Sequence, residues 1–205
     1  AAVDLKRLVA AGLKQAELGF DAIDAYATPR RLVLVVTNLP KAQPDTVEER
    51  RGPRVGAPEK AVAGFLASTG LSLEACERRE TKKGEFYFAT IERKGQPAAD
   101  VLAPMLEDIL SRFPWPKSMR WGLGRTRWVR PLHGLTCLFD GRVVPVSFGG
   151  VQASNQTVGH RFLAPEAFQV KDFADYSARL RGAYVMLDKD DRRAAIAADA
   201  ALAAK

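Results

Sequence analysis

The chain has 205 residues, of which 47% are hydrophobic, and it carries a formal charge of +7 at pH 7. This apolar content is enough for a core and argues against a disordered chain, while the length suits one domain or two small ones. A transmembrane helix is excluded because no run of about 18 apolar residues occurs, and two cysteines, Cys76 and Cys137, are too few for a disulfide scaffold.

The first half of the chain predicts helices and hairpins. Apolar residues spaced three to four apart indicate an amphipathic helix over residues 1–18, for which Gly19 would supply the C-cap. Strands at 20–28 and 31–40 would form a hairpin across Thr28-Pro29-Arg30. The elements expected next are a short strand at 46–51 ended by Gly52-Pro53, a helix at Glu59–Thr69, a hairpin of strands 76–81 and 85–95 that turns at Lys82-Lys83-Gly84, and a helix from Pro97 or Ala98 to Phe113.

The second half begins with an irregular segment. Residues 114–130 are rich in Pro, Gly, Trp and Arg and show no period, so a loop is expected there. Strands at 132–139 and 142–148 would pair across Asp140-Gly141. The elements expected after them are strands at 157–162 and 168–170, a helix at 172–181, a strand at 183–187 and an Ala-rich helix at 188–205.

Hairpins pair most of these strands, so the predicted class is α+β, with a mainly antiparallel sheet and flanking helices. One α+β region over residues 1–205 is expected, with a weak internal boundary near 113–115, where the composition changes. Both ends fall inside predicted helices without a capping signal, which indicates a piece of a longer protein.

The excess positive charge is confined to one segment. Residues 111–161 hold eight Lys and Arg and a single acid, Asp140, whereas the rest of the chain has 23 basic and 23 acidic residues. A neutral scaffold with one basic segment favours an anionic partner, although runs of charge are also common on solvated surfaces.

A loop within the basic segment interleaves aromatic and cationic residues. Its members are Trp115, Lys117, Arg120, Trp121, Arg125, Arg127, Trp128 and Arg130, which include every tryptophan of the chain. Guanidinium groups form forked bonds with phosphates and indole rings stack on unpaired bases, so the loop is a candidate nucleic-acid site with Trp121 as its stacking residue. For Trp115 and Trp128 the favoured interpretation is that they anchor the loop in the core.

The sequence shows no catalytic or metal-binding pattern. The cysteines are far apart, and neither belongs to a Cys-x-x-Cys pair or lies near a His, so we expect no metal site and two thiols that pack as small apolar groups in a reducing compartment. His133 and His160 could each act as a general base, but a hydrogen-bonded structural role is the favoured interpretation because neither has a partnered nucleophile. No cofactor is expected in this chain.

Six short strings follow the order and spacing of one family. They are Thr28-Pro29-Arg30-Arg31-Leu32, Arg51-Gly52-Pro53, Lys83-Gly84-Glu85, Pro116-Lys117-Ser118-Met119-Arg120-Trp121, Val129-Arg130-Pro131-Leu132-His133 and Gly159-His160-Arg161-Phe162. Over essentially the whole chain, the sequence resembles the N-terminal part of the β subunit of the bacterial heterotetrameric glycyl-tRNA synthetase.

The resemblance implies a non-catalytic part of a cytoplasmic α2β2 enzyme that ligates glycine to tRNA(Gly). ATP, with Mg, would be used at the α subunit, and the fold would be similar to the editing-type B3/B4 module of phenylalanyl-tRNA synthetase. The implied partners are the α subunit, tRNA(Gly) and the remainder of the β subunit, with no membrane. The candidate tRNA contacts are the five cations of the loop together with Arg30, Arg31, Arg51, Arg54 and Arg161.

Two other functions stay open at this point. The basic surface could dock on the α subunit or on another β domain through ion pairs. Alternatively, His133 or His160 could belong to an editing-type hydrolytic pocket, although the sequence supplies no nucleophile–base pair for it.

Overall fold

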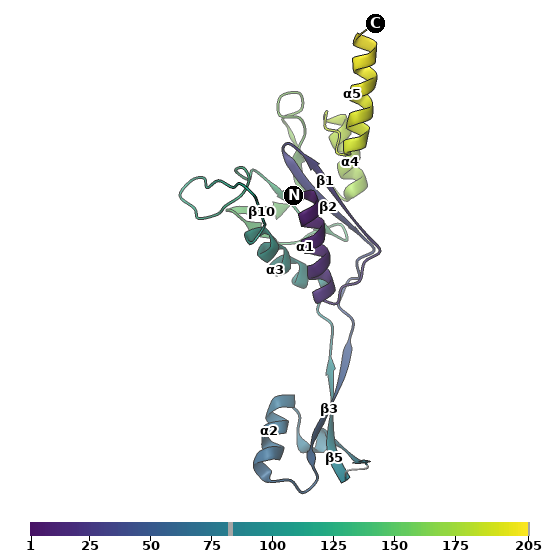
Figure 1. Cartoon of the computed structure of the whole chain (residues 1–205), viewed down its shortest axis with the longest axis vertical. Coiled ribbons are helices and arrows are strands. Elements are labelled where there is room, and N and C mark those ends of the chain that lie inside the picture. Colours follow the sequence, from purple (N-terminus) through teal and green to yellow (C-terminus); the bar gives the residue numbers. More distant parts are fainter. Residues whose placement is uncertain (82–83, 205) are drawn as a thin grey trace. The chain divides into compact units, whose positions relative to one another are not determined.

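The computed structural model describes residues 1–81 and 84–204, and the chain divides into two compact units (Figure 1). The main unit comprises Ala1–Ala42 and Gln96–Lys205, and the inserted unit comprises Gln43–Gly95. The change of composition at 113–115 lies inside the main unit. Among the described residues, no helix is long and apolar enough to cross a membrane.

The described elements form the predicted α+β class. The helices are α1 (Ala2–Gln15), α2 (Glu59–Thr69), α3 (Ala98–Ser111), α4 (Phe173–Gly182) and α5 (Lys189–Ala203), with a 3-10 turn at Leu73–Ala75. The longer strands are β1 (Ala22–Thr28), β2 (Arg31–Thr37), β3 (Thr46–Arg54), β4 (Glu77–Thr81) and β5 (Gly84–Arg93). The short strands are β6 (Leu135–Thr136), β7 (Leu138–Phe139), β8 (Arg142–Val143), β9 (Ser147–Phe148), β10 (Val151–Ser154), β11 (Gln156–Val158) and β12 (Ala167–Gln169). The strand pairs are antiparallel except β6–β10, which is parallel.

The core of the main unit lies where α1 meets the β1–β2 hairpin and α3 (Figure 1). α1 buries Leu5, Val9 and Leu13, which share one face because they are four residues apart. Gly12 lets α3 approach, since a Cβ there would stand 2.7 Å from Met105 Sδ. Each fully buried Leu or Val contributes about 1.5–3 kcal/mol of transfer free energy, so this seam holds the two helices together.

The first helix ends earlier than predicted. Ala16, not Gly19, is its C-cap, and Glu17 takes the left-handed conformation with φ 55°. The Leu18 N–H donates to the carbonyl of Leu13, and the Leu18 side chain is buried in the core. Burial of Leu18 therefore turns the chain before the glycine is reached.

The predicted hairpin at Asp140-Gly141 is present, but its strands are much shorter than expected. β7 and β8 pair through two residues each, and Asp140 and Gly141 both have positive φ. β9 instead pairs with β10, which also pairs with β6. The buried side chains of Val144 and Val146, on either side of Pro145, leave the ladder to enter the core.

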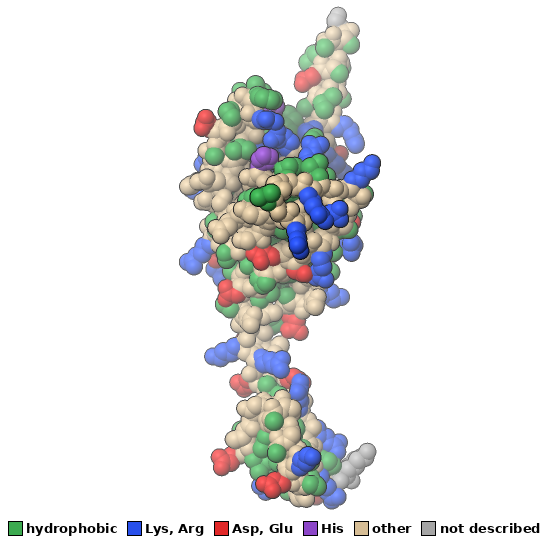
Figure 2. Space-filling view, turned by 90° about the vertical axis from the view of Figure 1, so that its left-hand side faces the viewer, with side chains coloured by type: hydrophobic (Ala, Val, Ile, Leu, Met, Phe, Trp, Pro, Cys, Tyr) green, Lys and Arg blue, Asp and Glu red, His purple; other side chains and the backbone are tan. Residues whose placement is uncertain are grey.

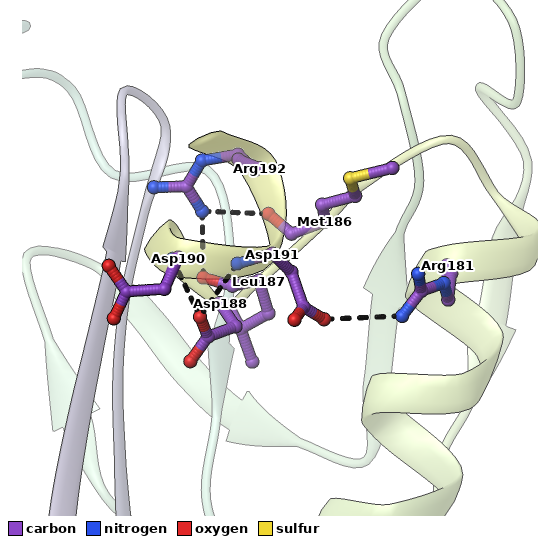
Figure 3. Close-up of polar contacts among 7 residues, drawn as sticks. All are labelled: Arg181, Met186, Leu187, Asp188, Asp190, Asp191 and Arg192. Carbon is purple, nitrogen blue, oxygen red and sulfur yellow. Dashed lines mark hydrogen bonds and ion pairs between the residues drawn. The ribbon is translucent and has the colours of Figure 1, made fainter. Parts of the chain in front are cut away.

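The strand predicted at 183–187 is wrong, because this segment closes α4 and leads into α5. The Val185 N–H donates back to the carbonyl of Leu180, and Tyr184 has φ 61°, which no strand residue adopts. At the start of α5, the Asp188 carboxylate accepts the N–H groups of Asp190 and Asp191 (Figure 3).

The inserted unit is a three-stranded sheet of order β3-β5-β4 with α2 packed on one face. α2 has the predicted bounds, since it begins after Pro58 and ends at Gly70 in the left-handed conformation. Its Phe65 ring contacts Gly52, where a Cβ would stand 2.6 Å from the ring. β3 continues past Gly52-Pro53 to Arg54 with an irregular register, which corrects the expected stop at residue 51. The predicted turn residues Lys82-Lys83 lie outside the described residues.

Side chains alternate between the two faces of the inserted sheet. Tyr87 is buried toward α2, while Phe86 and Phe88 lie on the opposite face. The guanidinium of Arg51 lies 3.8 Å from the Phe86 ring centroid, and that of Arg79 lies 5.1 Å from the Phe88 centroid. Arg79 also pairs with Glu49 and Glu77, so the charges on this face are largely matched.

Candidate nucleic-acid interface

The basic loop, residues 114–131, follows directly from α3. α3 ends at Ser111 although it accommodates Pro104, and Pro114 and Pro116, which lack a backbone N–H, disfavour further helix. The loop is closed by a single antiparallel bridge between Met119 and Trp128, whose N–H groups donate to each other's carbonyls at 2.8 and 3.2 Å. Between the two bridged residues the chain turns at Gly122, which has the positive φ that glycine adopts without strain.

Aromatic rings hold the base of the loop to the core. Trp128 is only 8% exposed, and its ring lies 5.3 Å from that of Phe113, 4.8 Å from that of Trp115 and 5.2 Å from that of Phe148. The predicted anchoring role of Trp115 and Trp128 is confirmed. Burial leaves the Nε1 of Trp115 without a hydrogen-bond partner among the described residues.

Trp121 lies in a different setting from the one the sequence suggested. The ring is half-buried and packs against the main core cluster. A Cβ on Gly149 would stand 3.4 Å from both the Trp121 ring and the Thr126 methyl group, so the ring lies close over this glycine. The indole is therefore part of the loop's packing, with its ring only partly accessible.

The loop cations are exposed and pair with no acid in the described part of the chain. Lys117, Arg120, Arg125, Arg127 and Arg130 are all exposed, and none of them makes an ion pair with any residue that the structure describes. The one acid of residues 111–161, Asp140, forms an ion pair with Lys41, with 2.7 Å between Lys41 Nζ and Asp140 Oδ2. This hydrogen bond lowers the pKa of the Asp140 carboxyl. Lys and Arg side chains (blue) project from the side of the main unit on which the loop lies (Figure 2). Positive charge thus accumulates here without internal compensation.

Arg30 and Arg31 differ in their surroundings although they are neighbours. Arg30 is exposed at the β1–β2 turn and forms no ion pair with a described residue. The Arg31 guanidinium donates to the carbonyls of Val158 and Gly159 and thereby links β2 to the end of β11. Arg31 also bonds to Tyr176, whose pKa is nevertheless raised because burial outweighs that bond. Arg31 is consequently occupied within the chain.

Arg51 and Arg54 belong to the inserted unit, so the structure does not group them with the basic loop. Arg51 stacks on Phe86, and the Arg54 guanidinium lies beside Gly84, where a Cβ would stand 2.7 Å from Arg54 Nε. Both side chains are thus in contact with the face of the sheet that α2 leaves open.

His160 has a structural environment. Its Nδ1 accepts the backbone N–H groups of Phe162 at 3.3 Å and Leu163 at 3.2 Å, and the backbone N–H of His160 donates to the carbonyl of Ala183. The turn that it stabilises presents Arg161 to solvent, with the guanidinium 5.4 Å from the ring of Phe162. His133 is exposed and forms no hydrogen bond with the described part of the chain.

The same turn carries two apolar side chains that no sequence pattern marked as functional. Phe162 is 78% exposed and Leu163 is 63% exposed, although both are large and apolar. Phe162 ends the family string that begins at Gly159, whereas Leu163 lies outside it, and the exposure of both side chains is known only from the structure.

The described residues contain no group of three or more His, Cys, Asp or Glu side chains that could hold a metal ion. Cys137 is a poor nucleophile, because burial raises the pKa of its thiol to about 11 and keeps the thiol protonated. The main unit carries exposed cations on the basic loop that pair with no described acid, and aromatic rings anchor this loop in the core.

Comparison with known proteins places the chain in a family. The sequence model of "Glycyl-tRNA synthetase beta subunit" matches residues 1–205. The chain belongs to the glycyl-tRNA synthetase β subunit family. It is 50% identical to the glycine–tRNA ligase β subunit of Ruegeria sp. over 96% of this chain and 29% of that protein. The β subunit of Paracoccus denitrificans is 50% identical over 97% of this chain and 30% of that protein. The β subunit of Rhodospirillum centenum is 44% identical over 98% of this chain and 32% of that protein.

The chain therefore spans about 30% of the length of the curated glycine–tRNA ligase β subunits that it matches. The basic loop, the β1–β2 turn and the His160 turn all lie within the matched region, as do all six family strings.

Proposed function

We propose that this chain is the N-terminal region of a glycine–tRNA ligase β subunit and that its basic loop contributes tRNA binding to the ligation of glycine to tRNA(Gly). The α subunit and the remainder of the β subunit would be its protein partners. The chemical step would take place on the α subunit, which would bind ATP with Mg. The family membership supports the enzyme, and the environment of the loop supports the role within it.

The observation that carries the proposal is the set of five exposed cations without partner acids. Arg120, Arg125 and Arg127 lie between the bridged residues Met119 and Trp128, and none of the five cations pairs with an acid among the described residues, so an external anion can match their charge. Arg30 and Arg161 are exposed in the same unit and are candidates for further phosphate contacts. Each phosphate that is neutralised releases condensed counterions, so binding would weaken as salt rises.

The proposal is tested by measuring tRNA affinity for the parent chain and for the variant Arg120→Ala, Arg125→Ala, Arg127→Ala over a range of salt concentrations. We expect the triple variant to bind more weakly and to lose part of the salt dependence, because each lost phosphate contact reduces the slope by about 1.

A matched control removes three arginines that already have partners. Arg50, Arg79 and Arg179 pair with Glu48, with Glu49 and Glu77, and with Asp175, respectively. Their combined replacement by Ala changes the net charge equally, so a comparable loss of affinity would show that the effect is one of total charge and not of the loop.

A second function has its own observation in its favour. Phe162 and Leu163 are exposed on a turn that His160 fixes, and rigid exposed apolar side chains are typical of protein-docking sites. The turn would then contact the α subunit or another part of the β subunit. Sedimentation of the chain mixed with the α subunit tests this: co-migration that Phe162→Ser abolishes supports docking, and separate migration of the parent argues against it.

A further inference from the structure

The aromatic rings of the basic loop are committed to packing. Trp115 and Trp128 contact each other and Phe113, and Trp128 also contacts Phe148 in an edge-on arrangement. Trp121 packs against the core cluster and lies over Gly149. The large apolar side chains that the loop does expose are aliphatic, and they are Met119, Leu123 and Val129.

This arrangement differs from that of proteins that bind single strands. Such proteins place aromatic rings where successive bases can stack on them, and the rings supply a large part of the affinity. A loop whose aromatic rings are buried or half-buried offers little of that binding free energy. What it retains is charge, since its five cations are exposed and unpaired among the described residues.

A double helix fits these properties better than a single strand. In duplex RNA the bases are already stacked and paired, so a protein contacts phosphates and 2′-hydroxyl groups and reads shape more than sequence. Phosphate density is also higher along a duplex, which increases the counterion release that each bound cation produces. Arginine suits such contacts because its planar fork can hold two phosphate oxygens.

We propose that the basic loop binds the sugar–phosphate backbone of double-stranded RNA and does not stack on unpaired bases. This inference rests on the proposed function, which it narrows to a class of RNA structure. Lys117, Arg120, Arg125, Arg127 and Arg130 contact backbone groups, and the half-buried Trp121 ring makes no contact with the RNA.

The test compares two RNA probes with the whole chain. One is a blunt duplex of about 16 base pairs, a length that double-stranded RNA-binding modules typically span, and the other is an unstructured single strand of the same length. We expect the duplex to bind at least about fivefold more tightly at each salt concentration, with a slope of log K against log salt of no more than about 5 in magnitude for five phosphate contacts.

Two variants separate backbone binding from stacking. Trp121→Leu keeps an apolar side chain but removes the aromatic face, and Phe162→Ala removes the exposed ring nearest to Arg161 in sequence. We expect each to leave duplex affinity within twofold, after circular dichroism has shown that the variant is folded. A stacked base contributes roughly fivefold or more to binding, so a loss of that size would overturn the inference.

The comparison of parent affinities does not depend on the folding of any variant. Equal or tighter binding of the single strand contradicts the inference but leaves the proposed RNA-binding role standing. If neither probe binds and tRNA does not bind either, the proposed function itself fails.

Discussion

At the scale of single residues, close backbone approaches define the main unit as much as large side chains do. Gly159 is buried where β11 ends, and Arg31 and His160 are both organised around it. A Cβ on Gly159 would collide with the Ala183 side chain and stand 2.9 Å from the Ala183 carbonyl oxygen and 3.0 Å from Ala164 Cβ. Two of these three atoms belong to Ala183 at the end of α4, and the third belongs to Ala164, which follows the His160 turn.

Gly159→Ala is therefore expected to destabilise the main unit by about 1–3 kcal/mol, as overpacking of a tight contact usually does. Urea unfolding followed by tryptophan fluorescence measures this, because the three tryptophans lie in the main unit. Gly134→Ala is the control, since a Cβ there has nothing within 4 Å and the residue lacks a positive φ. An equal free energy of unfolding for the parent and Gly159→Ala would contradict this prediction, because it would show that Ala183 and Ala164 can shift to make room for the added methyl group.

The residues of the candidate site were only partly predictable from the sequence. The segregation of charge into residues 111–161 identified the loop cations, because a segment with a single acid cannot pair them locally. The roles of Arg31 and Trp121 could not be predicted, since their contacts at Val158 and Gly149 are distant in sequence and depend on the fold.

At the scale of elements, two side chains of its first turn join α5 to the rest of the main unit: Arg192 bonds to β1, and Asp191 pairs with Arg181 of α4 at 3.3 Å (Figure 3). Arg192 donates to the carbonyls of Met186 and Leu187 at 2.8 Å each, and to the carbonyl of Ala27 on β1 at 3.1 Å. The helix itself buries no residue, so these bonds, and not apolar packing, fix its first turn.

Arg192→Ala is expected to loosen α5 and the 183–188 segment, at a cost of roughly 1–2 kcal/mol for lost bonds from a charged donor. Hydrogen exchange of the α5 amides gives the readout, with faster exchange predicted for the variant. Arg193→Ala is the matched control, because Arg193 is exposed and reaches only Asp190 at 3.7 Å. Identical protection in Arg192→Ala and Arg193→Ala would contradict the role given to Arg192.

Element prediction succeeded where local signals agreed and failed where packing decided. α2 has its predicted bounds because Pro58 and Gly70 flank a regular apolar pattern. The apolar run at 183–187 looked like a strand, but bonds back to α4 and the positive φ of Tyr184 make it an interhelical turn. Likewise, the strands after the basic loop are short because Val144 and Val146 enter the core instead of extending the ladder.

At the scale of the whole molecule, the chain consists of a main unit and an inserted unit with separate cores. In each unit the two chain ends at the boundary meet. The Ala98 N–H donates to the carbonyl of Lys41 in the main unit, and Gly95 contacts Gln43 in the inserted unit. Neither the change of composition at 113–115 nor any run of Gly and Pro marked these boundaries in the sequence.

Replacing Gln43–Gly95 by a short Gly-Ser linker is expected to leave the main unit folded, because its ends already meet at Lys41 and Ala98. RNA affinity should stay within about threefold of the parent, since the loop cations lie in the main unit. A larger loss in a folded deletion variant would instead assign RNA contacts to Arg51 and Arg54.

The central claim is that the unpaired cations of the basic loop bind tRNA phosphates. The most direct measurement is the slope of log K against log salt for tRNA(Gly), compared between the parent and the Arg120→Ala, Arg125→Ala, Arg127→Ala variant. We expect a steep negative slope for the parent that becomes shallower by about 3 in the variant. A parent affinity that is flat with salt, or the same slope in both proteins, would contradict it.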